Sequence, residues 1–209
     1  MLRRIHPVIV LDAVVTLAVL IAAQVAPESF LQLRAQREGP LEHVSHVVLL
    51  AALGAWGLAA RSLRRPSRGI ALAIAAYLLL LLLEEIDWGL VYGIDIGFEH
   101  LFGVPSFHQT TWKNEHVWQD KLYWFGAPVA AWFSAAWLWE GLRRYAPAAP
   151  TRADSAAFLS ILLTFLVVDQ LHPHVIGIYQ TVMYALFAWI GWRASATTAG
   201  TRHDGGHPR

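Results

Sequence analysis

Residues 70–89 read IALAIAAYLLLLLLEEIDWG, and this stretch sets the fold class because a long apolar run ends in closely spaced acids. A helix needs about 20 mostly apolar residues to cross the hydrocarbon core of a membrane. The run from Ile70 to Leu83, extended back to Gly69 and forward to Trp88, reaches that length. The stretch therefore predicts a transmembrane helix with carboxylates at one end.

The composition of the whole chain agrees with a membrane protein. Its 209 residues are 56% hydrophobic and 15% charged, whereas soluble domains are about 25% charged. This balance excludes a disordered chain and an ordinary soluble enzyme. The chain has no cysteine, which excludes a disulfide-stapled domain, thiolate nucleophiles, iron–sulfur clusters and cysteine-type zinc sites.

Five further apolar segments approach the length needed to cross a membrane, at residues 8–26, 44–60, 122–142, 156–171 and 175–192. Pro173 separates the last two, so we expect a tight helical hairpin there. A signal peptide is the alternative for the first segment, but Gln24 lies where cleavage requires a small residue. We therefore expect an all-α, polytopic bundle of about six transmembrane helices. It forms one domain over residues 1–193, with an outer-face loop at 93–121 and a disordered tail at 194–209.

Charged side chains divide between the two ends of the predicted helices. Most of the 16 basic residues, including Arg3, Arg4 and those between Arg61 and Arg68, fall on the side of the N-terminus. Basic loops of membrane proteins stay in the cytoplasm, so we expect both termini to be cytoplasmic. The sequence thus predicts a multi-pass protein of the bacterial inner membrane, in contact with the lipid bilayer and without a nucleic-acid partner.

Three acids, Glu84, Glu85 and Asp87, lie where the predicted helix reaches the outer edge of the membrane. One charge in hydrocarbon costs at least about 2.5–3.5 kcal/mol, so acids at this depth usually mark a functional site. Glu84 and Asp87 are expected to share a helix face, while Glu85 points elsewhere. We expect these carboxylates to be catalytic. The alternative is that the helix ends at Leu83 and the acids are solvated.

Histidines gather with the acids on the outer side. Residues 42–46, EHVSH, place Glu42, His43 and His46 on one side of a helix, and His116 lies four residues before Asp120 in the outer loop. Oxygen and nitrogen ligands suit Zn, Fe or Mn, and a catalytic zinc needs three protein ligands. The sequence predicts a divalent metal site with the ligands His46, His116, His172, Glu84 and Asp87. Further candidates for the site are Glu42, His43, His108, Asp120, Asp169 and His174.

The motif Glu84-Glu85-x-x-Trp88-Gly89, followed by a polar loop that ends in Asn114-Glu115-His116, resembles a group of bacterial multi-spanning membrane proteins. Those proteins carry an E-E-x-x-W-G signature after an apolar helix, and their downstream element ends in a His-Asn pair. The resemblance implies a shared polytopic fold. It implies no activity, because the proteins of that group are uncharacterised.

Several functions are compatible with these features. The leading hypothesis is a metal-dependent hydrolase or lipid-modifying enzyme that acts on a lipid at the outer face. A proton- or cation-coupled transporter would use the same acids as a relay, although the third span offers no polar path inward apart from Tyr77. The remaining alternatives are a haem-binding subunit with His46 and His174 as axial ligands, and a non-enzymatic assembly subunit.

Overall fold

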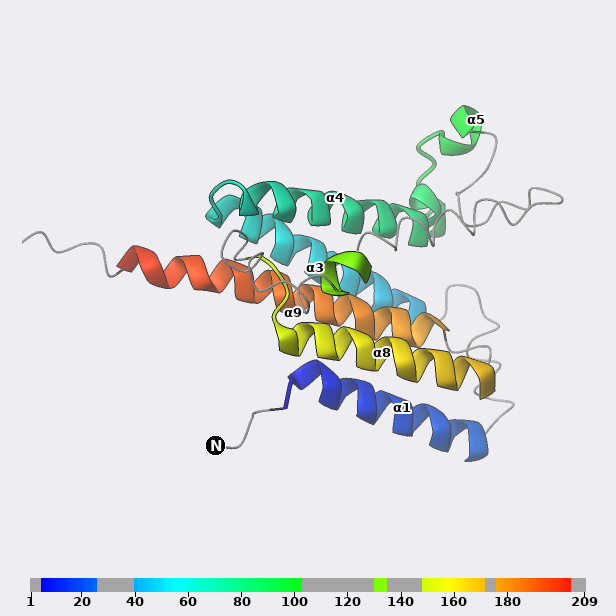
Figure 1. Ribbon diagram of the computed structural model, residues 1–209. Coiled ribbons are helices and arrows are strands. Elements are labelled where there is room, and N and C mark those ends of the chain that lie inside the picture. The colour runs from blue at the N-terminus through cyan, green and yellow to red at the C-terminus, as the bar shows by residue number, and fades with distance from the viewer. Residues whose placement is uncertain (1–4, 26–39, 103–129, 135–147, 172–175, 204–209) are drawn as a thin grey trace, which may run out of the picture.

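The computed structural model describes residues 5–25, 40–102, 130–134, 148–171 and 176–203, and every regular element within these ranges is helical. The long helices are α1 (Pro7–Val25), α3 (Pro40–Ser62), α4 (Ser67–Glu85), α8 (Arg152–Leu171) and α9 (Ile176–His203) (Figure 1). After α4 come a 3-10 helix, η1 (Asp87–Tyr92), and one short helix, α5 (Phe98–Phe102). The all-α prediction is therefore confirmed for the described residues.

The long helices lie side by side in one bundle (Figure 1). The most extensive contact joins α3 to α9, α4 covers the other side of α3, and α8 and α1 pack on α9. The direction of α3 and α9 is opposite to that of α1, α4 and α8. As a result, α1 begins and α9 ends at the same end of the bundle.

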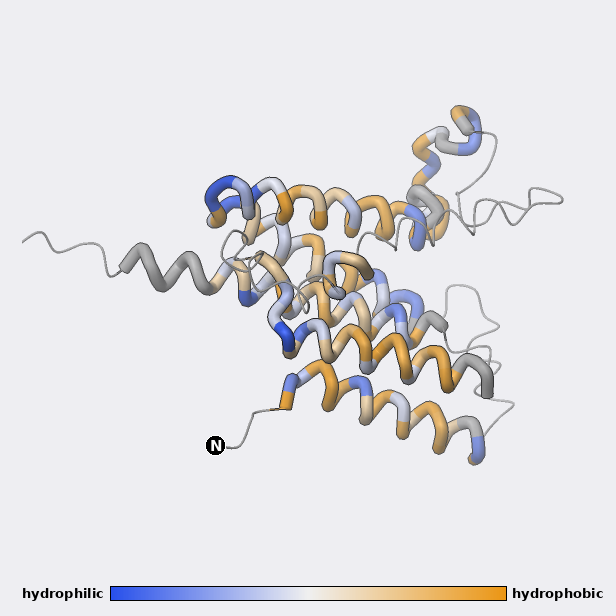
Figure 2. Tube along the Cα trace, viewed as in Figure 1, coloured by the Kyte–Doolittle hydropathy of each residue, from blue (hydrophilic) through white to orange (hydrophobic). Residues whose placement is uncertain are grey.

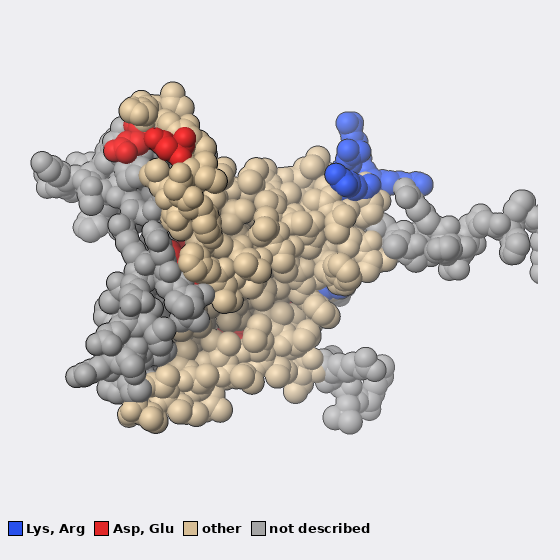
Figure 3. Space-filling view, turned by 180° about the vertical axis from the view of Figure 1, so that it is seen from behind, with Lys and Arg blue, Asp and Glu red and all other residues tan. Residues whose placement is uncertain are grey.

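The two ends of the bundle carry opposite charge (Figure 3). We call one the arginine end, defined by the exposed side chains Arg61, Arg64, Arg65 and Arg68 around the turn from α3 to α4. We call the other the carboxylate end, defined by Glu84, Glu85, Asp95 and Glu99. The sorting of charge expected from the sequence thus has a counterpart in the packed structure.

Among the described residues, two helices are long and apolar enough to cross a membrane, α3 over Glu42–Ser62 and α4 over Ser67–Glu85, so the expected number of about six spans is not supported. The apolar part of α1, Pro7–Ala22, is shorter. Of the expected span at 122–142, residues 130–134 are described, and they are helical. The end of α9 at His203 places the first part of the tail, expected to be disordered, in a helix, although its threonines, serine and glycine are weaker helix formers than alanine.

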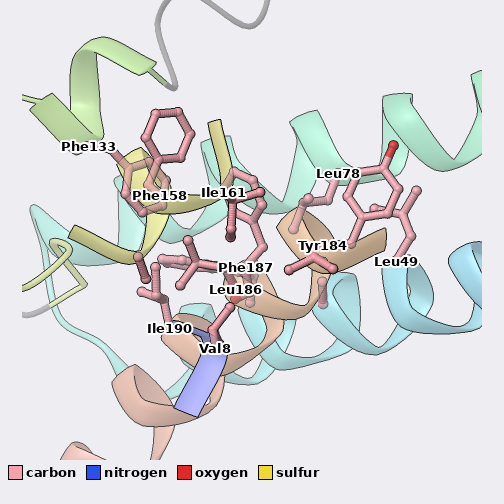
Figure 4. Close-up of a cluster of buried hydrophobic side chains, with 14 of the residues drawn as sticks. Val8, Leu49, Leu78, Phe133, Phe158, Ile161, Tyr184, Leu186, Phe187 and Ile190 are labelled. Atoms are coloured by element: carbon pink, nitrogen blue, oxygen red, sulfur yellow. The ribbon is translucent and has the colours of Figure 1, made fainter. Parts of the chain in front are cut away.

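The core forms where α3, α4, α8 and α9 meet (Figure 4). Leu49 and Trp56 from α3 pack with Leu78 from α4 and Leu186 from α9, and all four are almost fully buried. The indole Nε1 of Trp56 donates a hydrogen bond to the carbonyl oxygen of Phe187 at 3.0 Å. This bond satisfies the polar atom of a buried indole and fixes the α3–α9 contact.

The long helices consist largely of apolar residues (Figure 2), and many of these are exposed. Large apolar side chains that are at least 45% exposed lie on all five long helices, among them Val14, Leu17, Ile21, Val47, Leu50, Leu72, Leu79, Leu163, Leu166, Val167 and Trp192. Soluble monomers rarely expose apolar surface in such continuous stretches. The bundle is therefore apolar both inside and on much of its surface.

A buried carboxylate joins α1 to α8. Asp12, which is 1% exposed, accepts hydrogen bonds from the hydroxyls of Ser160 at 2.9 Å and Thr164 at 3.0 Å. One turn further along α1, the hydroxyls of Thr16 and Tyr179 are 2.9 Å apart, which adds a contact to α9. These polar contacts fix how α1 is rotated against its neighbours.

A second buried carboxylate joins three helices at the arginine end. Asp154 is fully buried and accepts from the backbone N–H and the hydroxyl of Thr151, which makes a capping box at the start of α8. The same carboxylate pairs with the guanidinium of Arg193 on α9 and lies 3.1 Å from Nε2 of His6, just before α1. Because Nδ1 of His6 accepts from the N–H of Val8, Nε2 carries the proton and donates to Asp154.

Candidate functional site

The carboxylates expected at the end of the third span lie at the end of α4. Glu84 belongs to the last turn of this helix and is 4% exposed. The alternative that the helix ends at Leu83 with both glutamates solvated is therefore wrong for Glu84. Glu85 is half-buried, and its Oε1 accepts a hydrogen bond from the hydroxyl of Tyr184 on α9 at 2.9 Å. As expected, the two glutamates have different surroundings.

The geometry expected for Asp87 requires correction. Since α4 ends at Glu85 and Asp87 begins the 3-10 helix η1, the two carboxylates at 84 and 87 do not share the face of one α-helix. Gly89 follows with φ +103, and a Cβ there would lie 2.6 Å from the carbonyl oxygen of Ile94, so only glycine fits. This tight turn directs the chain away from the helix axis right after the glutamates. The side chain of Asp87 lies outside the described part of the structure.

Two histidines and a tyrosine meet at the start of α3. Nδ1 of His46 lies 3.0 Å from the hydroxyl of Tyr92, the last residue of η1, and Nδ1 of His43 lies 3.5 Å from the same hydroxyl. The ring centroids of the three residues are 6.0–6.1 Å apart in each pair. The expectation that His43 and His46 lie together on one side of the helix is thus confirmed. Tyr92 comes to them because η1 folds back toward α3.

The Nε2 atom of His46 is the unusual atom of this cluster. The side chain is 4% exposed, and Nε2 is buried without a hydrogen-bond partner among the described residues. Two proton arrangements satisfy Tyr92. In one, His46 donates from Nδ1 and Nε2 keeps a lone pair; in the other, Tyr92 donates to Nδ1 and Nε2 carries a buried, unpaired N–H. A buried N–H without an acceptor is the rarer and more costly case, so the first arrangement is favoured.

Of the candidate residues for the metal site, the described structure brings His43 and His46 together. Among the described residues, no group of three His, Asp or Glu side chains is placed to hold a metal ion. Glu42 is half-buried near the start of α3, and Asp169 is in the last turns of α8, where its side chain is not described. The remaining predicted positions lie outside the described residues: His108, His116, Asp120, His172 and His174. The complete set of ligands therefore stays a prediction.

Two tyrosines of this region were not anticipated from the sequence. Tyr92 orients His46 and Tyr184 donates to Glu85, yet neither belongs to a recognisable motif. The one available signal was position: Tyr92 comes three residues after Gly89, the last residue of the E-E-x-x-W-G motif. At the other end of the bundle, Thr151-Arg152-Ala153-Asp154 has the spacing of a capping box and marks the start of α8 from sequence alone.

No protein-family model matches the chain, and searches of curated proteins and of solved structures give no match either. Functional inference for this protein therefore depends on its own residues. The resemblance to bacterial proteins with an E-E-x-x-W-G signature stays a prediction.

Proposed function

We propose that this chain is a multi-pass protein of the bacterial inner membrane, with about six spans and cytoplasmic termini, and that its carboxylate end faces outward. We further propose that this end carries the active site of a metal-dependent hydrolase or lipid-modifying enzyme. The single observation that carries the second proposal is the buried Nε2 of His46, which has no hydrogen-bond partner in the part of the chain that the structure describes.

Charge and surface support the membrane location. Four exposed arginines gather at the turn from α3 to α4, and the positive-inside rule places such a short basic turn in the cytoplasm. The exposed side chains between the two ends are largely apolar on α1, α3, α4 and α8. In a bilayer these side chains contact lipid, so no further protein surface is needed to cover them.

Three features support a catalytic role for the carboxylate end. A histidine that binds a metal through Nε2 usually donates its other N–H to a fixed acceptor, and Tyr92 occupies that position for His46. Glu84 is buried at the same end of the bundle, where a carboxylate serves as a ligand or general base. The lipid bilayer beside this end would supply an amphiphilic substrate directly.

The chemistry expected of this site is hydrolysis or group transfer at a carbonyl or phosphoryl centre. A bound Zn, Fe or Mn ion would lower the pKa of a water ligand and polarise that centre. His46 would hold the ion through Nε2, and His116 and His172 are the proposed further ligands. Glu84 would accept the proton of the attacking water and return it to the leaving group.

Metal analysis of the protein purified after mild detergent extraction tests this proposal. We expect about one Zn, Fe or Mn ion per chain in the wild type, as a catalytic site requires, and a loss of at least tenfold in His46→Ala. His100→Ala is the matched control, because His100 is exposed on α5 and is not a proposed ligand. Equal metal content in His46→Ala and His100→Ala would overturn the proposed site.

The protonation of His46 provides a second test that is independent of the substrate. We expect the nitrogen chemical shifts of labelled histidine to show His46 as the Nδ1–H tautomer when the metal has been removed by a chelator. Tyr92→Phe removes the fixed acceptor and should produce a mixture of tautomers. A pure Nε2–H tautomer in the wild type would exclude Nε2 as a ligand or base.

A further inference from the structure

A cavity lies in the half of the bundle nearest the arginine end. Its volume is about 310 Å³, and its walls are formed by Trp56 of α3, Ile70, Ile74 and Tyr77 of α4, and Phe133 and Ile190 from the other side. These side chains line it almost entirely with apolar atoms. The volume is at the lower end of the range for ligand sites, about 300–1,000 Å³.

The helix α4 connects this cavity to the arginines. Ile70, Ile74 and Tyr77 follow the helical repeat, so one face of α4 forms a wall that begins within the first turn of the helix. That wall extends over roughly 10 Å at 1.5 Å per residue. Arg64, Arg65 and Arg68 immediately precede it, and all three are exposed. The apolar lining on α4 therefore begins two residues after Arg68, close to the strongly basic end of the bundle.

The charge of this basic end is not neutralised within the described structure. Arg61, Arg64, Arg65 and Arg68 make no ion pair and no side-chain hydrogen bond with any described residue. The first turn of α4 contains no acid, so the positive end of its helix dipole adds to the same field. Figure 3 shows these basic side chains projecting from the surface. A ligand that suits both features has an anionic head and an apolar tail.

We propose that the arginine end binds an anionic phospholipid, with one acyl chain in the cavity and the phosphate on the arginines. Guanidinium groups match phosphate oxygens in geometry and charge, and each basic residue near an anionic headgroup is worth about 1 kcal/mol. The cavity excludes a headgroup because its lining is apolar. This site lies at the opposite end from His46; it rests on the proposed membrane location and is independent of the proposed catalysis.

Thermal unfolding of the full chain in detergent, with added lipid, tests the proposal. Phosphatidylglycerol should raise the unfolding temperature by several degrees, whereas phosphatidylcholine with the same acyl chains should raise it much less. Glycerol phosphate, which has the head without the tail, should have no effect. Equal stabilisation by both lipids would contradict the proposed preference for an anionic headgroup. Stabilisation by glycerol phosphate alone would contradict the proposed binding of an acyl chain.

Two variants, each with a control variant, test whether the arginines and the cavity bind the lipid. The triple variant Arg64→Gln, Arg65→Gln, Arg68→Gln should weaken the apparent phosphatidylglycerol affinity by about tenfold or more, while the corresponding lysine triple keeps most of it. Ala73 of α4 also lines the cavity, so Ala73→Phe should fill it and weaken phosphatidylglycerol binding as well. Its control is Leu72→Phe, at an exposed neighbouring position that does not line the cavity. Unchanged affinity in the glutamine triple, or equal affinity in the two phenylalanine variants, would contradict the site.

Reconstitution separates this inference from the proposed location. If the purified chain does not insert into lipid nanodiscs, the membrane location fails and the lipid site fails with it. If it inserts but retains no excess of phosphatidylglycerol over phosphatidylcholine in native mass spectrometry, the lipid site alone is wrong.

Discussion

At the scale of single residues, the buried acid Asp12 shows how this bundle accommodates a charge without a cation nearby in the described structure. Its oxygens accept from Ser160 and Thr164 on the neighbouring helix. The hydroxyl of Thr164 also lies 2.9 Å from the carbonyl oxygen of Ser160 within α8. The Thr164 hydroxyl therefore has a second acceptor within its own helix, whereas the Asp12 carboxylate depends on the hydroxyls of Ser160 and Thr164 for its hydrogen bonds.

This asymmetry predicts unequal effects of mutation. The double variant Ser160→Ala, Thr164→Val leaves a buried carboxylate without donors and should lower the free energy of unfolding by about 2 kcal/mol. Asp12→Leu removes the charge as well and should cost less. Thermal unfolding in detergent measures both, with Ser62→Ala as a control because its hydroxyl bonds to Ala59 of the same helix. A larger loss in Asp12→Leu than in the double variant would contradict this account.

At the scale of elements, the contact between α3 and α9 depends on the absence of a side chain at Gly191. A Cβ at this position would lie 3.0 Å from Cδ1 of Trp56 and 3.1 Å from Cβ of Ala55. The indole cannot move aside easily, because it is buried and its Nε1 is bonded to the carbonyl of Phe187. Small residues allow helices to approach this closely in membranes, where packing is the main source of association.

The variant Gly191→Ala should therefore destabilise the bundle, although alanine is the better helix former. We expect a lower unfolding temperature in detergent, by a few degrees, from separation of α3 and α9. The matched control is Gly57→Ala on α3, where a Cβ meets nothing within 4 Å, and here the gain in helix propensity of up to about 1 kcal/mol should appear. If Gly191→Ala had the higher unfolding temperature and Gly57→Ala the lower, Trp56 would not limit how closely α3 and α9 approach each other.

The helices themselves could be predicted from the sequence, whereas the contacts between them could not. The apolar segments predicted most ends of α1, α3, α4, α8 and α9 to within a few residues, whereas α9 continues 11 residues beyond the expected end at 192. The partners of Asp12 and Glu85 depend on which faces meet, and no local pattern encodes that. The expected helix ran on to Trp88, whereas α4 ends at Glu85, because apolar length alone does not show where the 3-10 helix η1 begins.

At the scale of the whole molecule, the two ends of the bundle have separate roles in our proposals. The carboxylate end holds His46, Tyr92 and the two glutamates, and it would face the outer leaflet. The arginine end holds the capping box at Asp154, the four exposed arginines and the apolar cavity, and it would face the cytoplasm. Both assignments depend on the same orientation of α4, so that orientation is the first property to measure.

Single cysteines can measure this orientation without background, because the chain contains no cysteine of its own. Asp95→Cys lies at the carboxylate end and Arg65→Cys at the arginine end, and both positions are exposed. In intact spheroplasts, a membrane-impermeant maleimide should label Asp95→Cys strongly and Arg65→Cys only after lysis, since basic turns remain in the cytoplasm. Labelling of both in lysed cells controls for reactivity. Reversed labelling would invert the topology and place His46 in the cytoplasm, and labelling of both variants in intact spheroplasts would mean that α4 does not cross the membrane.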